Sequence, residues 1–288
     1  MSQSFATSTS PRAVVISGAS TGIGRSCALH LDRLGFHVFA GVRRAADAHA
    51  LTQVASPRLT PIVLDITDPG AVAAARQAVS DRNLAMTQAF LPLLRRSRGR
   101  IVNISSLAGR LAVPVMGSYT AAKHALEGLS GSLRLELATS GVRVSVVEPG
   151  DIQTSMSGKL HRDVTAALST LPDDGVRRYS ALVRGVEVAI GAGAEGGAPP
   201  AVVAEAVAHA LTSHRPRIRY QVGPRSRRMT LLARLLPDRL LDSVLQRTFE
   251  PRPRTTTASP TIPAAMSTPG PYPTKRKDTS NDVNDMAR

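Results

Sequence analysis

The chain has 288 residues, of which 42% are hydrophobic, 20% are charged and 3% are aromatic, and its formal net charge is +15. That is enough apolar material for one sizeable core, and it excludes a wholly disordered or collagen-like chain. The single cysteine excludes an intrachain disulfide, and no run approaches the roughly 20 apolar residues of a membrane span, so we expect a cytoplasmic protein.

Strands and helices alternate between a lead at 1–11 and a Pro-, Thr- and Ser-rich tail at 251–288, both expected to be disordered. Apolar strands are predicted over 13–17, 37–42, 60–64, 100–105, 143–148 and 217–221. Helices are predicted over 22–35, 70–97, 118–140 and 201–213. This alternation is typical of a parallel sheet covered on both faces. The sequence therefore predicts one α/β domain at 12–250, a doubly wound parallel sheet of Rossmann type.

A glycine-rich turn follows the first predicted strand and opens the first predicted helix. Its glycines, Gly18, Gly22 and Gly24, have the spacing Gly-x3-Gly-x-Gly. Glycines at such a turn let the backbone approach a pyrophosphate, and the helix N-terminus supplies free N–H groups. The alternative is a plain strand-to-helix turn.

Two arginines and an aspartate end the next two predicted strands. Arg43 and Arg44 stand where an NAD-dependent enzyme places an acid on the ribose 2′-hydroxyl. A guanidinium instead pairs with a 2′-phosphate, so Arg43 indicates NADP. The alternative is two exposed surface arginines. Asp65 either reaches the adenine amine or caps the turn at 67–70.

A serine, a tyrosine and a lysine form a candidate catalytic set. Tyr119 and Lys123 lie four residues apart in a predicted helix and therefore share one face. An ammonium near a phenol favours the phenolate, and such a tyrosine can exchange a proton with a carbonyl oxygen or an alcohol. Ser106 follows the predicted strand at 100–105, at the edge where ligands of open α/β sheets bind. Alone, each feature is equally a chance helix pair or a serine-rich turn.

Together these motifs resemble the short-chain dehydrogenase/reductase family over about residues 12–224. The likeness rests on the three loop glycines, Ser106, the pair Tyr119 and Lys123, and Pro149-Gly150 with Thr154. It implies that the serine hydrogen-bonds the substrate oxygen and that the tyrosine is the acid/base. The lysine is implied to hold the nicotinamide ribose and to favour the phenolate.

The resemblance also implies a cofactor-binding set and a branch of the family. The segment 149–154 resembles the stretch that contacts the nicotinamide carboxamide. The residues implied for NADP are Gly18, Ser20, Gly22, Ile23, Gly24, Arg43, Asp65, Tyr119, Lys123, Pro149, Gly150, Ile152 and Thr154, and no metal is implied. The strand at 38–43 and the Arg219-Tyr220 segment look most like the retinol and hydroxysteroid dehydrogenases.

One part of the family pattern is absent. Family members carry a further strand ending in Asn-Asn-Ala-Gly and then a helix with a catalytic Asn, and only 35 residues here separate Asp65 from Ile101. A single helix over 71–98 would be ~42 Å long, too long for strands of ~20 Å, so we expect a break at 80–83. Asn83 is not at the position of the family's Asn, which falls on Val79. The usual fourth strand is therefore predicted to be lost, which either pairs its two neighbours directly or leaves a gap.

The leading functional prediction is an oxidoreductase that transfers a hydride between NADP(H) and a lipophilic alcohol or ketone. The alternative is a catalytically impaired, nucleotide-binding relative. A third hypothesis is a peripheral membrane or nucleic-acid binder driven by the basic region 214–254, which has eleven arginines against three acids. The alternative for that region is a solvated, arginine-rich surface. Without interleaved aromatics or DNA-binding motifs, the region predicts no nucleic-acid partner. The apolar stripe at 231–249 indicates a helix pair packed on its own domain, with docking on an anionic bilayer as the alternative, and a homo-oligomer stays open.

Overall fold

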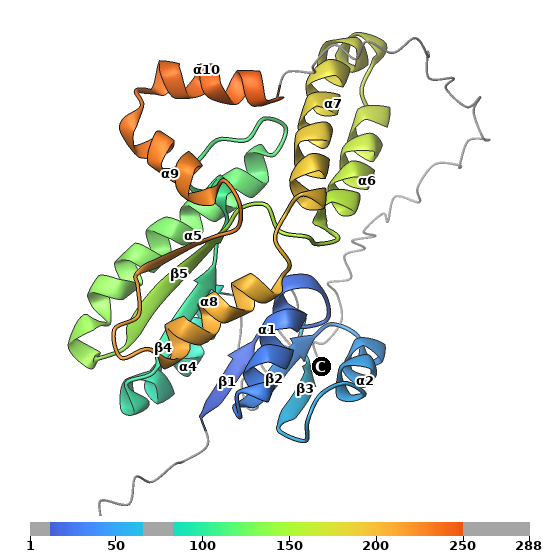
Figure 1. Ribbon diagram of the computed structural model, residues 1–288. Coiled ribbons are helices and arrows are strands. Elements are labelled where there is room, and N and C mark those ends of the chain that lie inside the picture. Colours follow the sequence, from blue (N-terminus) through green and yellow to red (C-terminus); the bar gives the residue numbers. More distant parts are fainter. Residues whose placement is uncertain (1–11, 66–82, 250–288) are drawn as a thin grey trace, which may run out of the picture. The chain divides into compact units, whose positions relative to one another are not determined.

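The computed structural model describes residues 12–65 and 83–249, and their strands form two parallel three-stranded sheets (Figure 1). The first sheet has the order β1 (Ala13–Ile16), β2 (His37–Val42), β3 (Leu59–Val63). The second has the order β4 (Arg100–Ile104), β5 (Arg143–Pro149), β6 (Arg219–Val222). Since parallel neighbours need a crossover connection, a helix separates each strand from the next along the chain.

Nine α-helices and two short 3₁₀ turns complete the described part of the chain. The helices are α1 (Gly22–Arg33), α2 (Ala45–Thr52), α4 (Asn83–Ser97), α5 (Gly117–Glu136), α6 (Met156–Ser169), α7 (Asp173–Glu195), α8 (Ala201–Thr212), α9 (Ser226–Leu235) and α10 (Asp238–Phe249). The 3₁₀ turns are η1 (Leu107–Gly109) and η2 (Ala138–Ser140).

The predicted α/β class with parallel strands is confirmed, and the strands of the described residues form two sheets rather than one. Within the described residues, β1 pairs only with β2, and β4 pairs only with β5. Of the two expected outcomes, direct pairing of β1 with β4 is not found. The expected helix break at 80–83 falls at the edge of the undescribed segment 66–82, after which α4 begins at Asn83. The expected lead at 1–11 and tail at 251–288 lie outside the described residues.

One hydrophobic core nevertheless joins the two sheets. Helix α8 packs on α1 and also contacts β4, β5 and β6. The buried core includes Leu31 of α1, Val38 of β2, Val147 of β5 and Val203 of α8. Arg100 adds a hydrogen bond from its guanidinium to the carbonyl oxygen of Ala210, at 2.8 Å. Helix packing therefore connects the two sheets, although the described residues contain no hydrogen-bonded ladder between them.

Helix α5 is fixed on the second sheet by a smaller core and a buried polar contact. Leu133 of α5 packs with Val142, which precedes β5, and with Val144 near the start of that strand. The side-chain amide of Asn103 on β4 donates to Ser130 of α5 at 2.9 Å, and both residues are buried. β5 is buried along nearly its whole length, and α5 packs against it.

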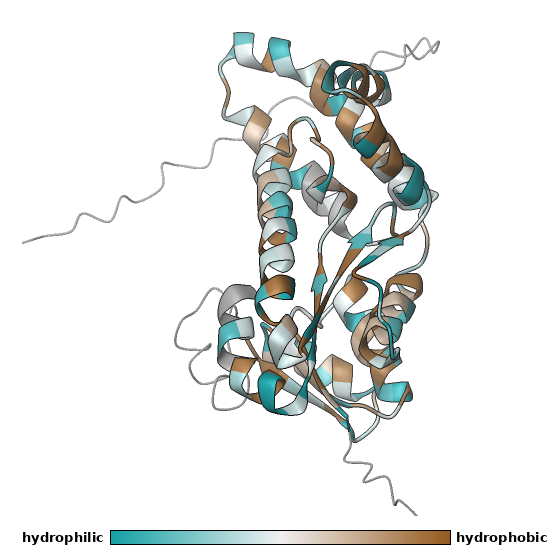
Figure 2. Ribbon diagram, turned by 90° about the vertical axis from the view of Figure 1, so that its left-hand side faces the viewer, coloured by the Kyte–Doolittle hydropathy of each residue, from teal (hydrophilic) through white to brown (hydrophobic). Residues whose placement is uncertain are grey.

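The C-terminal helices were predicted as a pair at 231–249 and are observed as α9 and α10. Helix α9 contacts β6 and η1, and α10 contacts α7. Figure 2 shows that the helices of the molecule carry both hydrophilic and hydrophobic residues along their length. Helices α2, α6 and α7 were not predicted.

Candidate functional site

The glycine-rich turn between β1 and α1 has the backbone geometry that only glycine adopts readily. Gly18 and Gly22 have φ angles of 68° and 56°, in the left-handed region. A Cβ at Gly24 would overlap the carbonyl oxygen of Gly18, so this position tolerates no side chain. A Cβ at Gly18 would meet nothing within 4 Å, which leaves open space beside the loop. The first turn of α1 thus presents its backbone N–H groups without a side chain in the way, as a pyrophosphate requires.

The neighbouring residues of this turn anchor it. The backbone N–H of Ala19 donates to the carbonyl of Gly41 at 2.8 Å, which ties the turn to β2. Ile23 packs against the main core, and Ser20 is half-buried. The turn is therefore fixed by a hydrogen bond to β2 and by the packing of Ile23 against the main core.

The two arginines after β2 differ in their partners. Arg44 forms a two-point ion pair with Asp47, at 3.0 Å from Nε and 2.9 Å from the terminal nitrogen. Hydrogen bonding to Arg44 holds the pKa of the Asp47 carboxyl below its usual value. Arg43 is exposed, and no described residue forms a hydrogen bond or ion pair with its guanidinium. Of the two, Arg43 is thus the one available to a ligand phosphate. Asp65, the last residue of the described range 12–65, also takes part in a polar or electrostatic interaction.

Ser106 stands where β4 gives way to η1. It is the N-terminal residue of that 3₁₀ turn, and its Oγ accepts a hydrogen bond from the backbone N–H of Ala108 at 3.2 Å. A Cβ at Gly109 would lie 2.7 Å from Ser105 Oγ and 3.2 Å from the carbonyl oxygen of Lys123. The absence of a side chain at Gly109 therefore lets the serine-bearing turn pack flush against α5.

Tyr119 and Lys123 lie on the face of α5 that meets this turn. The Lys123 ammonium nitrogen is 5.6 Å from the centre of the Tyr119 ring and donates to the carbonyl oxygen of Ile104 at 3.0 Å. Burial lowers the pKa of Lys123, and the nearby Glu127 carboxylate opposes that shift. The structure thus brings Ser106, Tyr119 and Lys123 to one junction between β4, η1 and α5.

The segment after β5 is pinned by backbone hydrogen bonds. Gly150 donates to the carbonyl of Val222 at 2.8 Å, and a Cβ on it would come within 3.2 Å of the carbonyl oxygen of Pro224. Ile152 forms a parallel bridge with Ala198. Pro149 ends β5, and Thr154 lies near the glycine turn, 3.8 Å from where a Cβ on Gly22 would stand.

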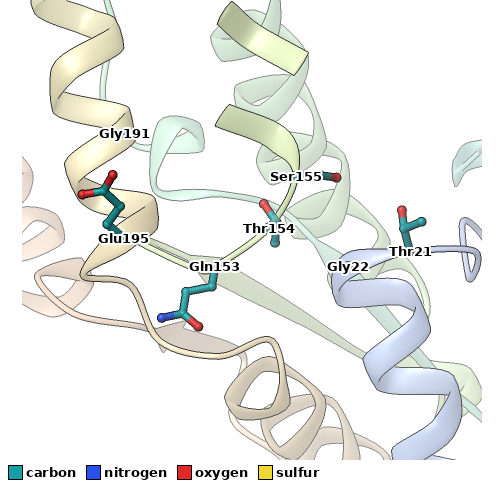
Figure 3. Close-up of a pocket in the computed structure, with 7 residues that line it drawn as sticks. All are labelled: Thr21, Gly22, Gln153, Thr154, Ser155, Gly191 and Glu195. Atoms are coloured by element: carbon teal, nitrogen blue, oxygen red, sulfur yellow. The ribbon is translucent and has the colours of Figure 1, made fainter. Parts of the chain in front are cut away.

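A cleft of about 650 Å³ opens between the glycine turn and this pinned segment (Figure 3). It is lined by Thr21, Gly22, Gln153, Thr154, Ser155, Gly191 and Glu195. Gly22 and Thr154 belong to the set implied for the cofactor, whereas Ser106, Tyr119 and Lys123 do not line the cleft. Sequence reasoning missed Gly191 and Glu195 because it did not predict α7, and the glycines of that helix gave no helical signal.

Metal chemistry and membrane spans have no structural support in residues 12–65 and 83–249. No group of three or more His, Cys, Asp or Glu side chains there could hold a metal ion. None of the helices in those ranges is long and apolar enough to cross a bilayer.

Comparison with solved structures confirms the fold. A short-chain dehydrogenase from Streptomyces avermitilis matches with a TM-score of 0.62 and 22% identity, covering 83% of this chain and 95% of that one. A short chain dehydrogenase from Burkholderia cenocepacia, solved in complex with NADP, matches with a TM-score of 0.58 and 24% identity, covering 84% and 98%.

Comparison with curated proteins and family models establishes the family. The uncharacterized oxidoreductase YbbO of Escherichia coli K12 is 31% identical over 274 residues, covering 82% of this chain and 94% of that protein. Human retinol dehydrogenase 5 is 33% identical over 284 residues, covering 81% and 87%. The short chain dehydrogenase model matches in two stretches, 12–83 and 81–165, which overlap at 81–83. The family's fourth strand was predicted to be lost in this part of the chain. With its glycine turn, its Ser-Tyr-Lys junction and these matches, the chain belongs to the short-chain dehydrogenase family.

Proposed function

We propose that this protein is an oxidoreductase that transfers a hydride between NADP(H) and an alcohol or ketone. The observation that carries the proposal is the junction at the end of β4. There Lys123 is held on the Ile104 carbonyl beneath the Tyr119 ring, and η1 brings Ser106 against the same helix. A tyrosine beside a fixed ammonium is suited to moving a proton to or from a substrate oxygen.

The chain's own residues divide the work. In ketone reduction, the substrate oxygen takes the proton from Tyr119 Oη while its carbon gains a hydride, so the carbonyl becomes an alcohol. Lys123 supports the resulting phenolate with its charge, and Ser106 Oγ donates a hydrogen bond to the substrate oxygen. The nicotinamide supplies that hydride when the cofactor is bound, and it accepts one in the reverse direction.

The glycine turn and the segment after β5 are the elements that would hold the cofactor. Gly18, Gly22 and Gly24 would face the pyrophosphate, with Ser20 and Ile23 beside them. The 149–154 segment would meet the nicotinamide end, through Pro149, Gly150, Ile152 and Thr154. The open space beside Gly18 and the shared cleft wall of Gly22 and Thr154 support this placement.

NADP is the proposed form of the cofactor because of Arg43. Its guanidinium is exposed and free of ion pairs among the described residues, and no acid ends β2. An unpaired guanidinium attracts a 2′-phosphate, whereas an acid would repel it. NADP in the Burkholderia relative's structure agrees with this choice.

The substrate class follows from the relatives and from the composition of the C-terminal helices. Retinol dehydrogenase 5 and an estradiol 17-beta-dehydrogenase of mouse, 29% identical over 292 residues, are named for lipophilic alcohols. Exposed leucines on α9, which contacts η1 and β6, and on α10, which contacts α7, give this chain apolar surface. We therefore propose a lipophilic alcohol or ketone.

The deciding experiment follows NADPH consumption over a panel of lipophilic ketones and aldehydes, with Tyr119→Phe as the matched variant. Wild-type turnover that the variant loses supports the proposal. Absence of turnover across the panel and in the alcohol direction overturns it.

A second candidate function has a specific observation in its favour. Because β1 and β4 share no ladder in the described residues, the glycine turn and the catalytic junction are carried by separate sheets. A relative that binds nucleotide without turning over substrate is consistent with that split. NADPH binding without any turnover would select this function.

A further inference from the structure

Four charged side chains form a cluster next to the proposed catalytic pair, with two buried carboxylates and two half-buried guanidinium groups. They are Arg110 after η1, Glu127 on α5, Glu148 on β5 and Arg219 on β6. One guanidinium nitrogen of Arg219 contacts Glu127 and lies 2.6 Å from Glu148. Arg110 Nε lies 3.1 Å from Glu148 and 4.0 Å from Glu127. Two cations and two carboxylates thus tie together the elements that carry the catalytic junction.

Burying the two carboxylates of this cluster costs free energy that a purely structural role does not explain. The Glu148 side chain is fully buried and that of Glu127 is 7% exposed. Each carboxylate also has one oxygen, Oε1 of Glu127 and Oε2 of Glu148, that is buried without a hydrogen-bond partner among the described residues. Apolar residues of similar volume often stabilise a fold as well as a buried ion cluster does. A role in setting charge accounts for residues that packing alone does not require.

Glu127 connects the cluster to Lys123. It lies one helical turn further along α5, on the same face, and its charge is the one that offsets the effect of burial on the Lys123 ammonium. A Cβ at Gly109 would come within 3.1 Å of Glu127 Cγ and 3.2 Å of the Lys123 carbonyl oxygen, so η1 is packed against both. Among the described residues, Arg110 and Arg219 form ion pairs with Glu127, and the Lys123 ammonium lies against the Tyr119 ring.

We propose that Glu127, whose carboxylate is held by Arg219 and Arg110, is a positioning residue that places an opposite charge on the face of α5 that carries the Lys123 ammonium. The inference rests on the proposed catalytic role of Lys123. Arg219 and Arg110 act one step further away, because their guanidinium groups form ion pairs with the Glu127 carboxylate and hold it in place.

The test measures the pKa of Lys123 by pH-dependent acetylation of the full-length protein, with the labelled peptide quantified by mass spectrometry. Glu127→Gln keeps the shape of the side chain and an acceptor for Arg219, but removes the charge. We expect the Lys123 pKa to fall by about half a unit or more, because a neighbouring opposite charge is lost. Glu136→Gln, at the exposed end of the same helix, is the matched control and should leave the Lys123 pKa unchanged.

The outcomes separate positioning from structure. A Lys123 pKa that stays put in Glu127→Gln overturns the inference, even if the melting temperature falls. If Glu127→Gln does not fold, Glu127→Asp decides: a smaller shift of the same sign supports the inference, and no shift overturns it. Acetylation needs no turnover, so an inactive wild type would overturn the proposed function while the labelling still decides the role of Glu127.

Discussion

The ammonium of Lys123 donates a hydrogen bond to the backbone carbonyl oxygen of Ile104, at 3.0 Å. This bond joins α5 to the C-terminal end of β4, two residues before Ser106. A lysine so fixed loses little further freedom when a ligand arrives, because its side chain is already ordered. The helix that carries Tyr119 and Lys123 is thus bonded to the end of the strand that leads to Ser106, and this contact needs no substrate.

Tyr119→Phe tests the proton-transfer role directly. The change removes only a hydroxyl, so the packing of the ring by Lys123 and NADPH affinity should both survive. Turnover should fall by ~10²–10⁴-fold, the usual contribution of a positioned acid or base. Steady-state kinetics and an NADPH titration of the same preparation measure both quantities. A loss below tenfold would assign the proton to another group.

Arg43→Ala tests the cofactor preference, and Arg44→Ala is its control. Arg43 has no hydrogen bond or ion pair with any described residue, so its removal should weaken NADPH binding by about 1.5–3 kcal/mol, the range for hydrogen bonds to charged groups. NADH affinity should change little. Arg44 is already paired with Asp47, so its removal should affect NADPH much less. Equal wild-type affinity for NADPH and NADH, measured by fluorescence titration, would refute the NADP assignment.

The phosphate loop makes a prediction about stability. In Gly24→Ala the new methyl group would overlap the Gly18 carbonyl, a backbone atom that cannot move aside alone. We expect a loss of about 1–3 kcal/mol in the free energy of unfolding, as for other overpacked sites. Gly128→Ala, on the exposed side of α5 with open space around it, should gain about 0.5–1 kcal/mol. Urea denaturation compares the two, and a harmless Gly24→Ala would mean that the turn is looser than the structure shows.

The strands were predictable because their apolar runs are short, continuous and bounded by turns. β2 was placed at its observed ends, and β5 within one residue, since nearly every position of β5 is buried. Helix α7 was missed because its several glycines lower helical propensity, and tertiary packing against α6 and α10 supplies what the local sequence lacks. The unpredicted α2 has no clear apolar stripe.

The candidate site was predictable only where a motif is local. Tyr119 and Lys123 are one helical turn apart, so a single window of sequence contains their relationship. The cluster behind them joins Arg110, Glu127, Glu148 and Arg219, which are far apart along the chain. Only the spacing of Glu127, four residues after Lys123, could have drawn attention to it.

The exposed leucines of the C-terminal helices allow a test of membrane docking, the alternative to a helix pair that only packs on its own domain. Leu231, Leu235 and Leu240 are 57%, 70% and 55% exposed, beside the arginines of α9 and α10. Apolar side chains next to cations suit an anionic bilayer. The full-length protein should co-sediment with vesicles containing phosphatidylserine at low salt and be released at high salt. Leu231→Ser/Leu235→Ser should weaken binding, and wild-type protein left in the supernatant at low salt would reject the idea.

The last prediction concerns the gap between the sheets. In the described residues, one edge of β1 and one edge of β4 have no hydrogen-bonded neighbouring strand. The two sheets are joined mainly by the packing of α1 on α8. A missing strand corresponds to ~4.8 Å of sheet, whereas ~1 Å of misplacement can cost on the order of 100-fold in rate. Inserting a family-like strand and helix between Ser80 and Leu84 should therefore raise both the melting temperature and turnover.

A Gly/Ser insert of equal length at the same place is the control, because it adds chain without a strand. Cys27 reports on core opening: it is buried in α1, and burial raises the pKa of its thiol to about 12, so it should react with a thiol reagent only when the core opens. The strand insert should slow this reaction, and the Gly/Ser insert should not. The unmodified protein could instead melt cooperatively and turn over near ~10 s⁻¹, a typical enzyme rate. That result would show that packing of α1 on α8 is enough to place the glycine turn correctly relative to Tyr119 and Lys123.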